Sequence, residues 1–146
     1  MCAEEQYTVL KTDPIISVVD DDVSVRNSMK RLLRSMEFEV RTFASALEFL
    51  QEGPLYHHGC VIVDVRMPGM SGLDFQKMLL ECGISLPVIF ITAYEDPATR
   101  TQAMQAGALA FLQKPLSDRL LADAIGLALE RSSQQRSGSS KTVRGE

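Results

Sequence analysis

The chain has 146 residues, a length that suits one folded domain with short extensions. Hydrophobic residues make up 45% and charged residues 23%, close to the average of soluble globular proteins, so neither a disordered nor a fibrous chain is indicated. The formal net charge is −4, and Lys and Arg form no cluster, which argues against direct contact with nucleic acid.

No apolar run approaches the ~20 residues that a membrane-spanning helix needs, so no contact with a membrane is expected. The polar start at residues 1–5 does not resemble a secretory signal, and a cytoplasmic protein is therefore expected. The cysteines lack C-x-x-C spacing and predict neither a disulfide framework nor a zinc site: Cys2, Cys60 and Cys82. Of these, Cys60 is expected in the core, whereas His57 and His58 are expected in a solvated loop.

The folded part is predicted to span residues 15–131. Residues 1–14 are polar, end in an Asp-Pro turn and form an N-terminal extension. Residues 132–146 are rich in Ser, Gln and Gly, which is the composition of a flexible tail or of the start of an interdomain linker.

Five short apolar segments are predicted to be strands. Four of them show no alternation of apolar and polar residues, which indicates burial on both faces, as in a parallel sheet covered by helices. They are Ile15–Val19, Glu39–Phe43, Cys60–Val63, Val88–Ile91 and Leu109–Leu112.

Helical segments follow these strands. An apolar stripe from Val25 to Met36 predicts the first helix, and a stripe from Leu120 to Leu129, capped by Ser117, predicts the last. Capping signals place two more helices at about 46–51 and 97–106. A further helix is expected at about 73–81, after a loop with two glycines at residues 68–72. Alternating strands and helices predict a three-layer α/β domain.

Polar residues stand where the predicted strands end. Three acids follow the first strand, one acid the third, a hydroxyl the fourth and an amine the fifth: Asp20, Asp21, Asp22, Asp64, Thr92 and Lys114. The carboxyl ends of parallel strands share one edge of the sheet, and short right-handed crossovers place the first and third strands side by side. We therefore expect the carboxylates to converge.

Carboxylates held close together repel one another, and Mg²⁺, which prefers oxygen ligands, relieves that repulsion. A lysine ammonium and a hydroxyl beside the metal could hold the oxygens of a transferred phosphoryl group. The Asp64 carboxylate would then be the nucleophile. The sequence predicts Mg²⁺-dependent phosphoryl transfer to Asp64, assisted by Thr92 and Lys114.

Each of these residues also has an ordinary structural explanation. Asp22 or Asp64 could cap a helix, Thr92 could end a strand and Lys114 could be a surface charge. Taken singly, these explanations are favoured. Taken together they are not, because unrelated caps would not be expected to supply these groups in this order of strands.

The motifs resemble those of receiver domains of two-component response regulators. The resemblance covers about 15–131 and is carried by Val18–Asp22, Val63–Gly72, Ile91–Ala93 and Lys114–Pro115. It implies a flavodoxin-like, doubly wound (βα)5 parallel sheet of strand order 2-1-3-4-5. It also implies that Asp64 receives its phosphoryl group from a sensor histidine kinase.

The resemblance further implies the roles of individual residues. Asp21 and Asp64 would ligate Mg²⁺ directly, together with the backbone carbonyl of Arg66, and Asp20 would act partly through water. Thr92 and Lys114 would bind the phosphoryl oxygens. The Lys114–Pro115 peptide is expected to be cis, and Phe111 matches an aromatic switch position, although a plain core aromatic is the alternative.

The segments Arg66–Gly72 and Ala106–Ala108 are most similar to receivers that precede a LuxR-type helix-turn-helix domain. The chain is therefore expected to be a fragment of a transcription regulator, with a stand-alone receiver as the alternative. It is expected to be a signalling switch rather than an enzyme, and to reach DNA only through an output domain. Phosphorylation is expected to alter the face made by the fourth helix and fifth strand and to promote homodimerisation.

Arg66 and Tyr94 each stand two residues beyond a predicted site residue. Our hypothesis is that their bulk shields the acyl phosphate from water. A magnesium-dependent phosphohydrolase would need an acid where Arg66 stands. A flavin- or nucleotide-binding module would need a phosphate-binding loop where the three aspartates stand.

Overall fold

The structure, a computed structural model, describes residues 14–52, 58–94 and 96–145. His57, Cys2 and nearly all of the predicted N-terminal extension lie outside the described residues. Within the described part of the chain, no helix is both long enough and apolar enough to cross a membrane.

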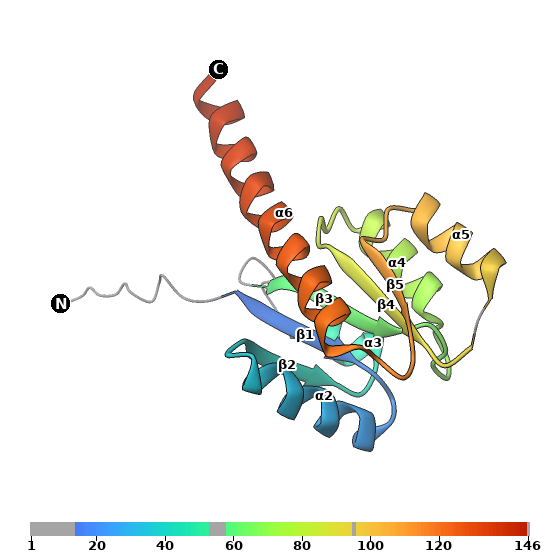
Figure 1. Ribbon diagram of the computed structural model, residues 1–146. Helices are drawn as coiled ribbons and strands as arrows, with labels where there is room; N and C mark the ends of the chain where they lie inside the picture. Colours follow the sequence, from blue (N-terminus) through green and yellow to red (C-terminus); the bar gives the residue numbers. More distant parts are fainter. Residues whose placement is uncertain (1–13, 53–57, 95, 146) are drawn as a thin grey trace.

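Strands and helices alternate along the chain, and the helices cover both faces of one sheet (Figure 1). The strands are β1 (Ile15–Val19), β2 (Glu39–Phe43), β3 (His58–Asp64), β4 (Val88–Thr92) and β5 (Ala110–Gln113). The helices are α2 (Val23–Ser35), α3 (Ala46–Leu50), α4 (Gly72–Glu81), α5 (Pro97–Gln105) and α6 (Asp118–Gly145).

The five strands are parallel and lie in the order β2-β1-β3-β4-β5, which confirms the predicted flavodoxin-like topology. The bounds of β1 and β2 are those predicted, and the other strands differ from prediction by one or two residues at an end. Strand β1 pairs with both β2 and β3, so the two strands that carry the acids are neighbours.

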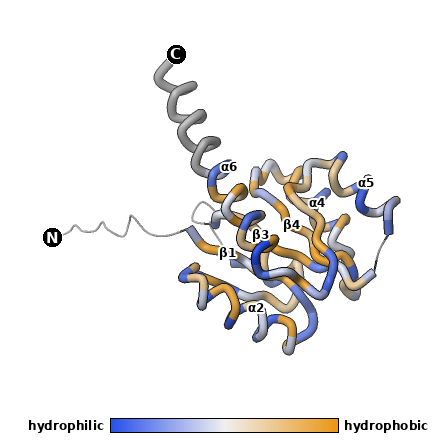
Figure 2. Tube along the Cα trace, viewed as in Figure 1, coloured by the Kyte–Doolittle hydropathy of each residue, from blue (hydrophilic) through white to orange (hydrophobic). Residues whose placement is uncertain are grey.

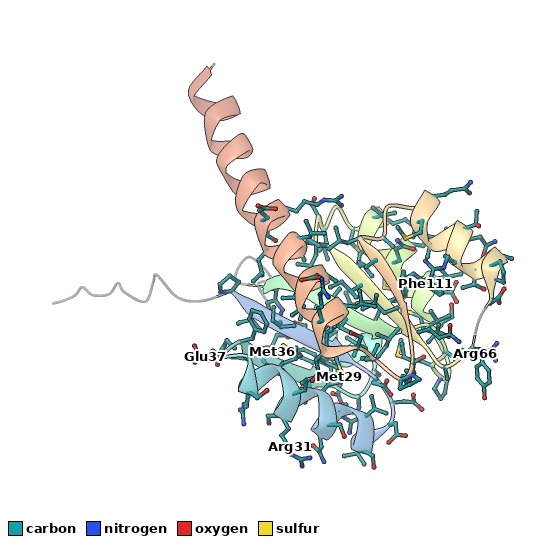
Figure 3. The ribbon with its side chains drawn as sticks, in the orientation of Figure 1. Met29, Arg31, Met36, Glu37, Arg66 and Phe111 are labelled. Atoms are coloured by element: carbon teal, nitrogen blue, oxygen red, sulfur yellow. The ribbon has the colours of Figure 1, made fainter. Side chains whose placement is uncertain are left out.

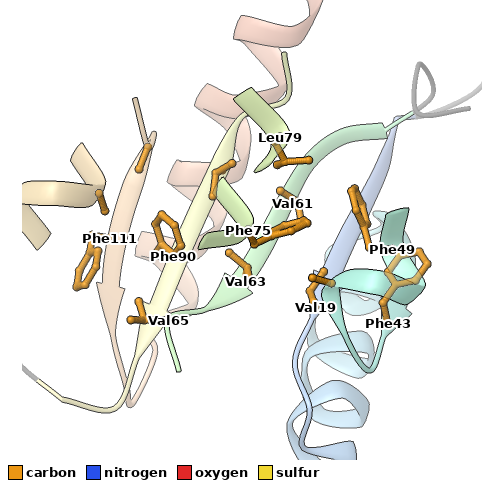
Figure 4. Close-up of a cluster of buried hydrophobic side chains, with 14 residues drawn as sticks. Val19, Phe43, Phe49, Val61, Val63, Val65, Phe75, Leu79, Phe90 and Phe111 are labelled. Carbon is orange, nitrogen blue, oxygen red and sulfur yellow. The ribbon is translucent and has the colours of Figure 1, made fainter. Parts of the chain in front are cut away.

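Apolar side chains cover both faces of the sheet, as predicted from the strands that lack an alternation of apolar and polar residues. One cluster lies beneath α3, α4 and α5, where Phe49 packs edge-on against Phe43 and Phe75 at 5.3 and 5.4 Å between ring centroids (Figure 4). The second cluster lies beneath α2 and α6 and includes the fully buried Leu33 and Ile125. The central strands are accordingly hydrophobic along their length (Figure 2).

Side-chain caps begin the helices where the sequence predicted them. Ser45 Oγ accepts from the backbone N–H of Glu48 at 3.1 Å, while Glu48 reaches back to the N–H of Ala44 at 2.9 Å. Asp96 caps α5 ahead of its first-turn proline, and Ser117 Oγ accepts from the N–H of Leu120 at 3.2 Å. These contacts satisfy backbone donors that a helix leaves free in its first turn.

Helix α6 is longer than predicted. A flexible segment was expected from residue 132, but the backbone remains helical to Gly145. The Ser and Gln residues that suggested flexibility cost a helix only a few tenths of a kcal/mol each, and Gly138 costs roughly 1 kcal/mol. No proline stands between residues 118 and 145 to end the helix.

The prediction that His58 lies in a solvated loop was wrong. His58 begins β3, is only 5% exposed and makes a 2.5 Å hydrogen bond between its Nδ1 and the Oγ of Ser17, a fully buried residue of β1. Its ring also packs edge-on against Phe49 at 5.6 Å. Cys60, two residues later, is fully buried as predicted, and burial raises the pKa of its thiol to about 12.

Gly59 marks the contact between the sheet and the middle of α6. The pairing of β1 with β3 steps from Ile15–His58 to Ile16–Cys60, so Gly59 is an extra residue on β3. Its carbonyl accepts a 2.8 Å hydrogen bond from the hydroxyl of Ser132, which is 8% exposed. Helix α6 is thereby fixed to the backbone of the sheet.

We predict that Gly59→Ala destabilises the domain. A Cβ at this position would lie 2.3 Å from Cδ2 of Leu129 and 2.8 Å from Cβ of Pro14, closer than packed atoms approach. Overpacking of this kind costs about 1–3 kcal/mol of unfolding free energy, measurable by urea denaturation.

The matched control is Gly126→Ala, an exposed position on α6 with no heavy atom within 4 Å of the added Cβ. It should stabilise the domain by roughly 0.5–1 kcal/mol because alanine favours a helix over glycine. Equal stabilities for the two variants would contradict the packing assigned to Gly59.

Candidate functional site

Four predicted site residues meet at the carboxyl edge of the sheet. Asp20 directly follows β1, Asp64 ends β3, Thr92 ends β4 and Lys114 directly follows β5. Ligands of open α/β sheets bind in the crevice outside this edge, and here it lies where the strand order reverses, between β1 and β3.

Lys114 and Asp64 are in direct contact. The Lys114 Nζ lies 3.1 Å from Oδ2 of Asp64, and the two side chains are 29% and 14% exposed. The other carboxylate oxygen, Oδ1, accepts from the backbone N–H of Arg66 at 2.8 Å. Asp64 is therefore held in one orientation, with an amine beside the oxygen that faces the site.

Asp20 is 1% exposed and only half satisfied. Its Oδ1 accepts from the backbone N–H of Asp22 at 2.9 Å, but its Oδ2 is buried and has no partner among the described residues. Burial raises the pKa of Asp20 from 3.8 to about 6, and the charge of Asp64 raises it as well, whereas the Asp22 N–H and the Lys114 ammonium lower it. A buried carboxylate oxygen without a donor fits a hard cation as its missing partner.

The other two acids of the first motif lie differently. Asp22 caps α2 by accepting from the N–H of Ser24 at 2.8 Å, so its side chain has the structural role that the sequence left open. Asp21 is exposed. Among residues 14–52, 58–94 and 96–145, no three His, Cys, Asp or Glu side chains already form a metal-binding group. The predicted ligand set relies on carboxylates and the Arg66 carbonyl together.

Thr92 lies at the site, but its hydroxyl is engaged elsewhere. The residue is 3% exposed, and Oγ1 donates to the carbonyl of Tyr94 and accepts from the Tyr94 N–H, both at 3.2 Å. Its own carbonyl accepts from the N–H of Lys114 at 2.7 Å. To bind a group on Asp64, the hydroxyl would have to leave the Tyr94 carbonyl.

The Lys114–Pro115 peptide is cis, as the resemblance implied. Phe111 is 6% exposed and lies 6.1 Å from Phe90 between ring centroids, in the cluster beneath α5. This position is compatible both with the switch role and with a plain core aromatic.

Arg66 and Tyr94, which follow Asp64 and Thr92 by two residues each, contact each other. The guanidinium carbon of Arg66 lies 4.7 Å from the centroid of the Tyr94 ring, within the range of a cation–π contact, and both residues are exposed. A cleft of about 490 Å³ opens beside them, lined by Arg66, Met67, Leu73 and Thr99 among others. This cleft contains none of the acids of the site.

Sequence reasoning missed two arginines that support the site. Arg26 donates from Nη1 to the carbonyl of Asp20 at 2.7 Å, which fixes the backbone of that acid. Arg100 of α5 contacts Phe111 of β5. Both are long side chains that reach across elements, and spacing along the chain carries no signal for such contacts.

Comparison with known proteins agrees with this geometry. The model of the response regulator receiver domain family matches residues 16–126. Nodulation protein W of Bradyrhizobium diazoefficiens is 43% identical over 89% of the chain and 57% of its own length. The transcriptional regulatory protein TdiR of Thauera aromatica is 48% identical over 78% of the chain and 50% of its own length.

A solved structure of the response regulator StyR superposes with a TM-score of 0.84 at 41% identity, covering 91% of this chain and 67% of that one. The chain spans about half the length of the curated relatives that it matches. Two of the curated relatives, TdiR and the FixJ protein of Azorhizobium caulinodans, are named as transcriptional regulatory proteins. The shared topology, the family match over most of the domain and the acids and lysine at one sheet edge together identify the chain as a member of the response regulator receiver domain family.

Proposed function

We propose that the chain takes a phosphoryl group from a sensor histidine kinase onto Asp64, with Mg²⁺ beside it, and so acts as a switch that controls transcription. The observation that carries this proposal is the contact between Lys114 and Asp64 next to the unpartnered oxygen of Asp20. The switch would work in the cytoplasm, with residues 15–131 as the receiver and the rest of α6 as the start of an interdomain connection.

Asp64 would be the nucleophile. Its Oδ oxygen forms a bond to phosphorus as the bond from phosphorus to the kinase histidine breaks, and the histidine nitrogen keeps the electron pair and takes up a proton. Receiver domains in general bind Mg²⁺ at the phosphorylation site. The residues that would hold it here are Asp21, Asp64, the Arg66 carbonyl and, partly through water, Asp20. When bound, the ion offsets the negative charge that the acids and the phosphoryl group bring together.

Lys114 and Thr92 would hold the phosphoryl group. The Lys114 ammonium already lies 3.1 Å from the Asp64 carboxylate and can move to a phosphoryl oxygen attached to it. The buried Thr92 hydroxyl would exchange the Tyr94 carbonyl for a second phosphoryl oxygen, a stronger acceptor. Phosphorylation of Asp64 on β3 would in this way move the segment that follows Thr92 at the end of β4.

A phosphohydrolase acting on small substrates is not favoured. Its acid or base would stand at position 66, where the arginine side chain lies against Tyr94 instead. We propose a switch that assists only its own phosphorylation and dephosphorylation.

We predict that acetyl phosphate with Mg²⁺ adds one phosphoryl group to the parent chain and none to Asp64→Asn, as measured by intact mass. EDTA should abolish the addition in the parent, because the acids would then repel the incoming phosphate. The matched control is Asp22→Asn, which keeps a good cap for α2 and should be phosphorylated like the parent. Phosphorylation of Asp64→Asn, or of the parent in EDTA, would refute the proposal.

The proposed output face is the edge of the domain made by α5, β5 and α6, where the two helices lie on opposite faces of the sheet and both contact β5. It exposes large apolar side chains at Met104, Leu120 and Leu127, with 42%, 56% and 56% of their surface accessible. Exposed apolar side chains on the two helices that flank β5 could contribute to a protein–protein contact along this edge.

We predict that phosphorylation shifts the chain from monomer to homodimer, measured as solution mass by light scattering. Leu120→Ser, which changes an exposed side chain, should weaken the dimer without lowering the phosphorylated fraction. Leu80→Ser, an equally exposed leucine on α4, is the control and should leave the dimer intact. An unchanged mass after full phosphorylation would exclude dimerisation.

We predict that replacing both Arg66 and Tyr94 by serine shortens the life of the acyl phosphate several-fold. The two side chains contact each other and follow Asp64 and Thr92 by two residues each, and our hypothesis is that together they limit the approach of water to phosphorus. The decay of the phosphorylated form after removal of acetyl phosphate measures this lifetime. Unchanged decay would show that the pair does not shield the site.

A further inference from the structure

Helix α5 is the helix least embedded in the core. Ala103 is its only fully buried residue, and the helix is mostly hydrophilic (Figure 2). Gln76 of α4 donates from Nε2 to the carbonyl of Ala103 at 3.2 Å, which fixes the middle of the helix. With so little apolar burial, single polar contacts have a large influence on where α5 sits.

Arg100, in the first half of α5, makes two contacts with one residue of β5. Its Nη2 donates to the carbonyl of Phe111 at 3.2 Å, and its guanidinium carbon lies 5.2 Å from the centroid of the Phe111 ring. The same ring contacts Phe90 of β4 in the core. Arg100 therefore ties a loosely packed helix to a buried aromatic ring.

The position of Arg100 also links it to Thr92. Its backbone N–H donates to the carbonyl of Asp96 at 3.0 Å, in the turn of α5 that Asp96 caps through Thr99. Asp96 follows Thr92 by four residues along the chain. A displacement of the backbone after Thr92 therefore reaches the first turn of α5, and with it Arg100.

We infer that Arg100 is a positioning residue that holds α5 and the Phe111 ring in the unphosphorylated arrangement, and that its contacts with Phe111 loosen when Thr92 turns to a phosphoryl oxygen. This inference rests on the proposed function. Removing the contacts would lower the cost of the rearrangement and so favour the phosphorylated arrangement without touching Asp64, the metal or the phosphoryl group.

The test compares the full chain with Arg100→Met, which keeps the aliphatic length and helix propensity but loses the cation and the donor. The control is Arg31→Met, an exposed arginine on α2 that points away from the domain, on the other face of the sheet from Phe111 (Figure 3). Both variants lose one positive charge, so a general charge effect would be equal in the two.

Arg100→Met should lower the acetyl phosphate concentration for half-maximal phosphorylation about two- to fivefold, the change expected from losing one exposed cation–π contact. Before phosphorylation, the Thr92 methyl resonance of a threonine-labelled sample should already be displaced toward its phosphorylated position. Arg31→Met should match the parent in both measurements. The displaced resonance is a readout that a purely structural role of Arg100 would not produce.

The outcomes separate the two proposals. A parent that takes no phosphoryl group overturns the proposed function and this inference with it. A parent that is phosphorylated, with Arg100→Met indistinguishable from it in half-saturation and in the Thr92 resonance, overturns the role of Arg100 alone. A shift of equal size in Arg31→Met would also overturn it, because the effect would then come from net charge.

Discussion

The ammonium of Lys114 and the carboxylate of Asp64 meet 3.1 Å apart in a place that also holds the buried carboxyl of Asp20. One ammonium group cannot neutralise two carboxylates. The carboxylate left without a full set of partners is Asp20, whose Oδ2 has no hydrogen-bond donor among the described residues and whose pKa is raised. A folded chain tolerates this arrangement because the remaining charge can be met by a metal ion or by protonation. The charge state of the site can therefore change when a cation or a proton binds, which is compatible with the proposed phosphoryl transfer.

The charged side chains lie at one edge of the sheet. The helix on one side of them, α4, is packed more tightly than the helix on the other side, α5. On one side α4 begins against the end of β3: the Gly72 N–H donates to the Val65 carbonyl at 2.8 Å, and a Cβ on Gly72 would lie 2.7 Å from the Asp64 carbonyl oxygen. On the other side α5 is held by few contacts, and the Thr92 hydroxyl bonds only to the backbone of Tyr94. Rearrangement is therefore cheaper on the side of α5 than on the side of α4.

The sheet and the residues at its edge could be predicted because they depend on local pattern and on the rules of parallel topology. Unalternating apolar strands predicted burial on both faces, and the strand order placed Asp20 beside Asp64. The contacts of Arg66 with Tyr94 and of Arg100 with Phe111 could not be predicted, since they join side chains of different elements whose separation only the folded backbone sets. His58 was predicted to be in solvent because two adjacent histidines beside a glycine are typical of a loop. Its buried partners, Ser17 and Phe49, belong to other elements, and the local sequence gives no sign of them.

The hydrogen bond from Ser132 to Gly59 and the buried apolar face of α6 together set the rotation of the helix about its own axis where it leaves the sheet and extends beyond it (Figure 1). Each residue of an α-helix turns the chain by about 100° and advances it about 1.5 Å. In a chimera joined after this helix, the direction in which the added module points around the helix axis would follow from these contacts with the sheet. Inserting or deleting residues beyond it would step the module around the helix axis without disturbing the receiver.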